Sequence, residues 1–138
     1  MVQKEFLNKV IIGLPKDATK DIKEVEGKIS WRTMSWAALD WLALLHTIGD
    51  TKYYPGNWQL CEPSVGIKRY SDALARHFKE WMKGSVIDED TSIPHIVQVM
   101  WNAEVVTHFL IEGGFIDELD SDLSRRLINE MKRKKNSG

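Results

Sequence analysis

The sequence predicts an all-α domain, and three observations support this fold class. Apolar residues recur at spacings of three and four in several segments, as they do on one face of a helix. No segment shows sustained alternation of apolar and polar residues, and there is no internal repeat. Glycines and prolines separate the periodic segments. We therefore expect a single helical bundle of four to five helices, with a long aromatic-rich loop between the second and third.

The N-terminal part of the chain divides into an arm and a first long helix. Residues 1–30 alternate charges with short apolar pieces, which predicts a loose arm with one or two short helices or strands. Thr33 or Ser35 can cap the next segment, which is rich in Ala and Leu, and Gly49 is suited to end it. Because this helix is apolar nearly all round, we expect it to be central.

An aromatic-rich loop, containing "TKYYPGNWQL", runs from there to about Gly66. The next segment, 67–84, is predicted to be an amphipathic helix that ends at Gly84. Its expected buried face consists of Ile67, Tyr70, Leu74, Phe78 and Trp81.

The C-terminal part contains two further predicted helices. An acidic loop leads to Pro94, which fits the first turn of a helix that stops at Gly113 and Gly114. A last helix runs from about Ser121 to residue 131. The basic residues 132–138 are predicted to fray as a solvated tail, in preference to binding an anion. The domain proper is thus expected to span residues 31–131.

Composition excludes several classes of protein. The 138 residues include 20 acids and 19 bases, so no net field favours nucleic acid or a membrane surface. A single cysteine, Cys61, rules out an internal disulfide and a cysteine-rich zinc site. There is no signal-peptide pattern and no apolar run of roughly 20 residues. We expect a cytoplasmic protein. Six tryptophans and largely apolar helices further predict a homo-oligomer.

Polar residues within the apolar helices are the first candidates for function, since a buried polar group needs a partner. At about 100° per residue, His95, Gln98 and Asn102 share one narrow sector of their helix. They form either a buried network that fixes helix register or part of a ligand site. His77 lies at the border of the buried face of the preceding helix, as a packed side chain or as the lining of a cleft.

Charged residues give the second group of candidates. Arg69, Asp72, Arg76 and Glu80 share one helical face, which by itself indicates a solvated strip of ion pairs. Asp40 stands alone in a helix expected to be buried, where a carboxylate needs a cation, a metal or a proton. The acids at 88–90 lie just before a helix, either exposed to solvent or able to bind Mg²⁺.

Four ordered stretches, "GDTKYYPGNW", "RYSDALARHFKEWMKG", "DEDTSIPH" and "WNAEVV", resemble one family. It is a phage-borne group, the N-terminal domain of dATP/dGTP diphosphohydrolase, loosely allied with MazG-like all-α nucleotide pyrophosphohydrolases. The resemblance covers about Trp31 to Val106. The matching positions are Gly49, Lys52, Tyr53, Asn57, Trp58, Arg69, Tyr70, Ala73, Arg76, His77, Gly84, Asp88, Asp90, His95 and Asn102.

The resemblance implies Mg²⁺-dependent (or Mn²⁺-dependent) hydrolysis of a purine deoxynucleoside triphosphate to the monophosphate and pyrophosphate. Such chemistry needs metal-binding carboxylates, cations for phosphate, and a positioned water. The implied metal ligands are Asp88 and Asp90, helped by Asp72 or Asp40, and His77 or His95 would activate the water. Substrate would be bound by Lys52, Arg69 and Arg76 through phosphate, and by Tyr53, Asn57, Trp58, Gln98 and Asn102 through the base. The host compartment would be the cytoplasm of a phage-infected bacterium.

The sequence also departs from the family pattern. Ser85 stands where the family has the Glu of a Gly-Glu pair, Asp90 replaces a Glu, and the Glu-x-x-Glu pair of MazG-like enzymes is absent. Loss of carboxylates weakens metal binding before nucleotide binding. Two alternatives to an enzyme therefore stay open. One is a non-catalytic protein that sequesters a nucleotide during phage–host conflict, and the other is a structural or interaction domain.

Overall fold

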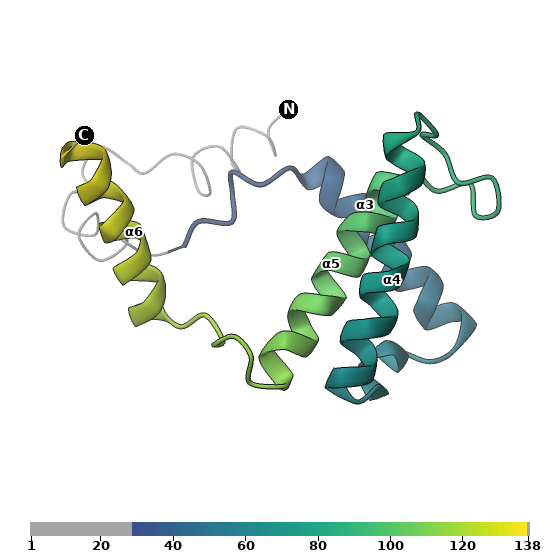
Figure 1. Cartoon of the computed structure of the whole chain (residues 1–138), viewed down its shortest axis with the longest axis horizontal. Coiled ribbons are helices and arrows are strands. Elements are labelled where there is room, and N and C mark those ends of the chain that lie inside the picture. The colour runs from purple at the N-terminus through teal and green to yellow at the C-terminus, as the bar shows by residue number, and fades with distance from the viewer. Residues whose placement is uncertain (1–28, 138) are drawn as a thin grey trace, which may run out of the picture. The chain divides into compact units, whose positions relative to one another are not determined.

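The computed structural model describes residues 29–137, and these form four α-helices and one short 3-10 helix (Figure 1). The elements are α3 (Trp36–Lys52), η2 (Asn57–Leu60), α4 (Pro63–Met82), α5 (His95–Glu112) and α6 (Ser121–Ser137). Within this range there is no strand, only an isolated bridge between Ile87 and Pro94. The predicted all-α fold is confirmed. The short elements expected in the N-terminal arm fall on residues 1–28, outside the described residues.

None of the helices in the described range is both long and apolar enough to cross a membrane.

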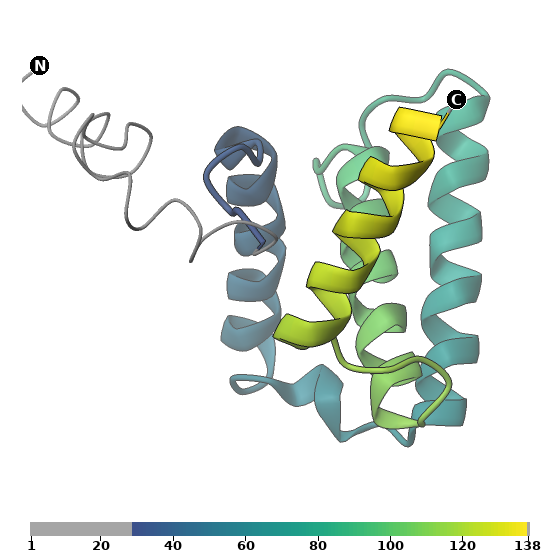
Figure 2. The same ribbon diagram turned by 90° about the vertical axis from the view of Figure 1, so that its left-hand side faces the viewer.

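The described chain divides into two compact units, residues 35–118 and a second unit that contains 29–34 and α6. In the first unit, α5 packs closely along α4 and less extensively against α3, and Figure 2 shows α5 between these two helices. The buried apolar side chains of this unit are Ile93, just before α5, and Val97, Val105 and Phe109 on α5. The core is therefore built around α5.

The expectation that the 33–49 helix is central is wrong. None of the residues of α3 is buried, and Trp36, Trp41 and Leu44 are exposed. Asp40 is exposed as well, so it needs no buried partner. Apolar composition alone could not show that α3 covers one side of α5 and presents its other side outward. A homo-oligomer, which such a surface would favour, stays a prediction.

The helix boundaries follow the capping signals only in part. Ser35 caps α3 by accepting a hydrogen bond from the Ala38 amide at 3.2 Å. Gly49, however, lies within α3, and the helix continues to Lys52. The next helix, α4, begins at Pro63 and not near residue 67, so the aromatic segment is shorter than predicted and contains η2. Gly84 and Gly114 follow α4 and α5 with positive φ angles of 95° and 77°, as their predicted helix-ending role requires.

Two further expectations differ from the structure. On α4, Ile67, Tyr70 and Leu74 are half-buried, but Phe78 and Trp81 are 46% and 38% exposed, so the predicted buried face holds only along its first half. In the second unit, α6 continues through Ser137, so residues 132–137 are helical where fraying was expected.

A close approach between α4 and α5 occurs at Gly66. A β-carbon placed on this buried glycine would lie 2.5–2.9 Å from three carbons of the Phe109 ring. Phe109 is only 1% exposed, so the ring cannot move aside without disturbing the core. Glycine at position 66 therefore allows the two helices to pack at this distance.

We expect Gly66→Ala to destabilise the protein by about 1–3 kcal/mol, because the new methyl group overlaps the Phe109 ring. The matched control is Gly49→Ala in α3, where a β-carbon meets nothing within 4 Å. That control should gain up to about 1 kcal/mol from better helix propensity. Urea unfolding followed by circular dichroism measures both, and equal effects of the two substitutions would contradict this packing.

Candidate functional site

The segment between α4 and α5 folds back on itself, and its acidic residues 88–90 contribute carboxylates to the candidate site. Its two arms are joined by backbone hydrogen bonds, from the Asp88 amide to the Ile93 carbonyl at 3.0 Å and from the His95 amide to the Val86 carbonyl at 2.9 Å. At the tip, Ser92 takes a left-handed conformation with φ 65°, and its amide donates to the Asp88 carbonyl at 2.7 Å. These bonds fix the position of Asp88 against the start of α5.

The Asp88 carboxylate accepts three hydrogen bonds. The Asp90 amide donates to Oδ1 at 3.0 Å, while Thr91 Oγ1 and Gln98 Nε2 both donate to Oδ2 at 3.0 Å. Gln98 Nε2 also lies 3.2 Å from Thr91 Oγ1, so the amide links helix α5 to the loop. These donors stabilise the ionised form and lower the pKa of Asp88, with the Gln98 hydrogen bond as the largest cause.

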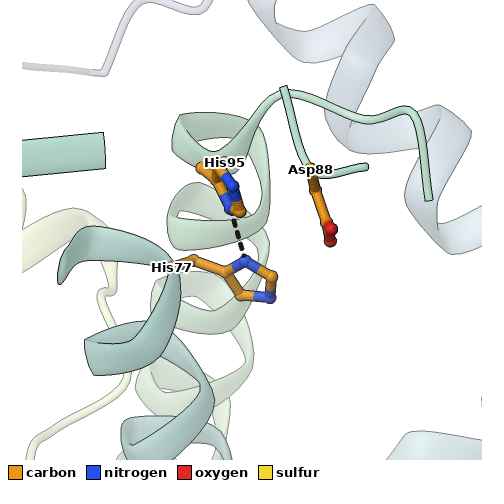
Figure 3. A group of neighbouring side chains, drawn as sticks. All are labelled: His77, Asp88 and His95. Carbon is orange, nitrogen blue, oxygen red and sulfur yellow. Dashed lines mark hydrogen bonds between the residues drawn. The ribbon is translucent and has the colours of Figure 1, made fainter. Parts of the chain in front are cut away.

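Two histidines from different helices meet beside this carboxylate. The Nδ1 atoms of His77 in α4 and His95 in α5 lie 3.0 Å apart, a hydrogen bond in which one ring donates and the other accepts. One potential ligand atom from each of His77, Asp88 and His95 lies within 4.8 Å of the other two. Figure 3 shows the two rings in contact and the Asp88 carboxylate directed toward the space beside them. This cluster joins α4, the loop and α5.

Burial lowers the pKa of His77, and the neighbouring His95 lowers it further. The His77 ring is therefore mostly neutral near pH 7, a state in which one ring nitrogen carries a lone pair. His95 is only 6% exposed. His77 thus supplies a neutral, partly desolvated imidazole, of the kind that metal binding requires, and the buried His95 lies beside it.

A first cavity of about 530 Å³ opens next to the two histidines. It is lined on the α4 side by the cationic Arg76 and Lys79 and on the loop side by the acidic residues 88–90. The remaining lining residues are His77, Glu80, Ser85, Ile87 and His95. Cations, carboxylates and imidazoles in one cavity suit a phosphate-containing ligand together with a cation.

A second cavity of about 510 Å³ lies between α3, the loop and α5, and its walls are more apolar. Leu45 and Ile48 from α3 and Trp101 from α5 supply apolar surface, and Asn102 supplies an amide. The other lining residues are Gly49, Lys52, Tyr53, Asp90, Thr91, Ile93 and Gln98. Asp90 lines both cavities, so they adjoin at the tip of the loop.

Within this cavity, Asn102 is the buried amide. Its Nδ2 donates to the Gln98 carbonyl of its own helix at 2.7 Å, and its Oδ1 has no partner among residues 29–137. Trp101 Nε1 is the one fully buried side-chain polar atom without a partner in residues 29–137, so the Asn102 oxygen keeps some exposure and can accept a hydrogen bond from a ligand. The polar sector predicted on this helix is thus divided between the two cavities: His95 lines the first, Asn102 and Gln98 line the second, and Gln98 also binds the loop between them.

Nine of the fourteen candidate residues line the two cavities. Arg76, His77, Asp88 and His95 line the first, Lys52, Tyr53, Gln98 and Asn102 line the second, and Asp90 lines both.

The other five candidates are not brought to either cavity. Asp72 pairs with Lys68 at 3.3 Å on the exposed side of α4, and Asp40 lies on the exposed side of α3. Arg69 Nη1 donates to Cys61 Sγ at 3.5 Å. Asn57 starts η2, and Trp58 packs into an aromatic cluster with His46, Trp101, His108 and Phe109. The aromatic turn therefore serves two purposes: Trp58 closes the core, while Tyr53 faces the second cavity.

Among the polar and aromatic lining residues, three were not singled out from the sequence: Lys79, Thr91 and Trp101. Lys79 lies one turn after Arg76, so a search for cations on one helical face could have found it. Thr91 and Trp101 gave no such signal, because their roles depend on how the loop folds against α5.

Fold and site together define a small all-α domain that gathers imidazole, carboxylate and cationic groups beside an apolar cavity. The chain belongs to the family described as dATP/dGTP diphosphohydrolase, N-terminal, whose model matches residues 18–119. This confirms the resemblance noted in the sequence. Comparisons with curated proteins and with solved structures return no match.

The Gln98 hydrogen bond gives a testable pH dependence. The lowered folded-state pKa of Asp88 contributes stability that is present above its unfolded pKa and is lost as pH falls through the folded value. Gln98→Met should raise the Asp88 pKa and cost about 1–2 kcal/mol near pH 7. The difference from the wild type should shrink as the pH is lowered from 7 through the unfolded and then the folded pKa of Asp88, because protonation removes the charge that the Gln98 amide stabilises.

Urea unfolding at pH 7 and at a series of lower pH values measures this difference in the free energy of unfolding. The control is Gln59→Met, which changes an exposed glutamine in η2 and should show no pH-dependent difference. A constant deficit for Gln98→Met at every pH would mean that the amide acts only through packing.

Proposed function

We propose that this protein hydrolyses purine deoxynucleoside triphosphates to the monophosphate and pyrophosphate, with the help of a divalent cation. The observation that carries the proposal is the pair of adjoining cavities that meet at Asp90. One is polar and cationic and the other is apolar with a buried amide, which corresponds to the phosphate and base ends of a nucleotide. The family description names the same substrates and chemistry.

The phosphate end is assigned to the first cavity. Arg76 and Lys79, three residues apart on α4, would neutralise the β- and γ-phosphate oxygens and the leaving pyrophosphate. Lys52 lines the second cavity, so it is separate from these two cations and would contact the α-phosphate or the sugar. Arg69 has no part in the proposal, because it lines neither cavity.

Metal binding is assigned to His77, Asp88 and His95, whose donor atoms are already close together. A bound divalent cation would neutralise phosphate charge and lower the pKa of a coordinated water. The chain's own task is to hold the three donors in place, which the loop hydrogen bonds to Asp88 and the contact between the two rings achieve. The histidines then serve as ligands and not as the general base.

Asp90 is the best candidate for orienting the attacking water. It is the residue common to both cavities, and the α-phosphorus of a bound nucleotide would lie between its base and its terminal phosphates. Attack there breaks the bond from the α-phosphorus to the bridging oxygen and releases pyrophosphate. A carboxylate at this point can accept the proton of the water.

The base end is assigned to the second cavity. Tyr53 and Trp101 offer ring faces, and Leu45 and Ile48 offer aliphatic surface against a flat base. The Asn102 amide oxygen can accept a hydrogen bond from the amino group of adenine or from the N1–H and amino groups of guanine. The volume of about 510 Å³ accommodates a two-ring base with its sugar.

The first test measures turnover of each deoxynucleoside triphosphate in the presence of Mg²⁺, Mn²⁺ and Zn²⁺, with products separated by ion-exchange chromatography. We expect dATP and dGTP to yield monophosphate and pyrophosphate faster than dCTP or dTTP. Asp90→Asn should lower kcat about 10²–10⁴-fold with little change in nucleotide binding. The control, Asp72→Asn on the outer side of α4, should retain wild-type kcat.

Two outcomes of this assay would contradict the proposal. Tight nucleotide binding without turnover under any of the metals would make the protein a nucleotide-sequestering one. No binding and no turnover at millimolar nucleotide would leave only a structural role for the polar cluster.

The second test concerns the base. Asn102→Leu should reduce kcat/KM for dATP and dGTP by about 10–100-fold, because the hydrogen bond to the base is lost. Turnover of dTTP in the same variant provides the internal control, since a folding defect would reduce all substrates equally. An unchanged preference for purines would remove Asn102 from the base site.

A further inference from the structure

The spacing of the two histidine nitrogens matches that of neighbouring ligands on one metal ion. Imidazole nitrogens bind Zn²⁺ and similar ions at about 2.0–2.1 Å, so two of them are about 2.9 Å apart at the right angle of octahedral geometry and about 3.4 Å apart at the tetrahedral angle. The Nδ1 atoms of His77 and His95 are 3.0 Å apart. The two rings come from different helices, α4 and α5, and are joined by the hydrogen bond drawn in Figure 3.

The third donor is poised beside the first two. A ligand atom of Asp88 lies within 4.8 Å of those of the histidines, so the carboxylate completes the site by a small side-chain shift or through one water. Its three hydrogen bonds use three of about four lone-pair positions, which leaves one for the cation. Gln98 and Thr91 orient the carboxylate, as outer partners commonly do for metal ligands.

The chemistry of these donors selects a class of metal. Mg²⁺ prefers oxygen ligands in octahedral geometry, with one or two carboxylates and several waters. Imidazole nitrogens favour first-row transition metals and zinc. Asp40 and Asp72, which would have made the site richer in oxygen, lie elsewhere on exposed helix faces. The donor set formed by His77, Asp88 and His95 therefore does not fit the Mg²⁺ expected from the sequence.

We infer that His77, Asp88 and His95 form a binding site, with two histidines and one carboxylate, for a divalent transition metal or zinc. Mn²⁺, Co²⁺ and Zn²⁺ are the ions that this set suits. The site's part in phosphate hydrolysis rests on the proposed function, but its existence does not, because metal binding can be measured with no nucleotide present.

The decisive experiment titrates Co²⁺ into chelator-treated full-length protein and follows the visible ligand-field bands. One equivalent should bind, and Zn²⁺ should displace it, while millimolar Mg²⁺ should not. In wild-type protein, addition of Zn²⁺ should shift the ¹⁵N imidazole NMR signals of two histidines, those assigned to His77 and His95. This second measurement needs no substitution and therefore does not depend on whether a variant folds.

The chain offers matched controls, since His46 and His108 are its other two histidines. His77→Ala and His95→Ala should abolish the Co²⁺ bands, whereas His46→Gln and His108→Gln should leave the bands unchanged. Gln98→Met, which removes an outer partner of Asp88, should weaken Co²⁺ affinity about 10–100-fold.

The inference falls if Zn²⁺ leaves the His77 and His95 signals unmoved, or if Mg²⁺ competes with Co²⁺ at equal concentration. It also falls if the His46→Gln and His108→Gln variants lose the Co²⁺ bands as fully as the His77→Ala and His95→Ala variants do. Transition-metal binding without any nucleotide turnover would uphold the site and defeat the proposed function. Turnover supported by Mg²⁺ alone, with no transition metal bound, would uphold the proposed function and defeat the transition-metal site.

Discussion

The close packing of α4 against α5 determines where the polar groups of the site lie. At one end of the contact, Gly66 lets the backbone of α4 approach the buried Phe109 ring. Toward the other end, His77 and His95 meet with their nitrogens 3.0 Å apart. Because both helices are rigid rods, the separation set at the glycine is transmitted to the histidines. The geometry of the site thus depends on a residue that touches no ligand.

The loop between these helices adds the Asp88 carboxylate to the two histidines and so completes the candidate site. It is closed by backbone hydrogen bonds on both arms and by Gln98, which reaches from α5 to Asp88. A carboxylate held by three donors loses little further freedom when it binds a cation. The same loop lies between the cationic cavity and the more apolar one, so a single short segment holds Asp88 beside the two histidines and contributes Asp90 to both cavities.

Much of the fold could be predicted from local signals, because Ser35, Gly84 and Gly114 act through their own backbone and nearest neighbours. The site could be predicted only in part. The helical sector of His95 and Asn102 followed from periodicity, but their division between two cavities depends on the position of the loop. Periodicity gives the angle of a residue around its own helix and not the direction of the neighbouring helix. Asp72 was therefore misplaced, although its helix was correctly identified.

The second cavity has one wall from α5 and one from α3, and the stability of the fold depends more on the α5 wall. Trp101 and Asn102 belong to the central helix, where substitutions disturb the core. Leu45 and Ile48 belong to α3, none of whose residues is buried. Substitutions on the α3 wall can therefore change the shape of the cavity at small cost in folding. Such a division lets the lining of this cavity vary while the cluster of His77, Asp88 and His95 stays intact, since the two are encoded on different parts of the chain.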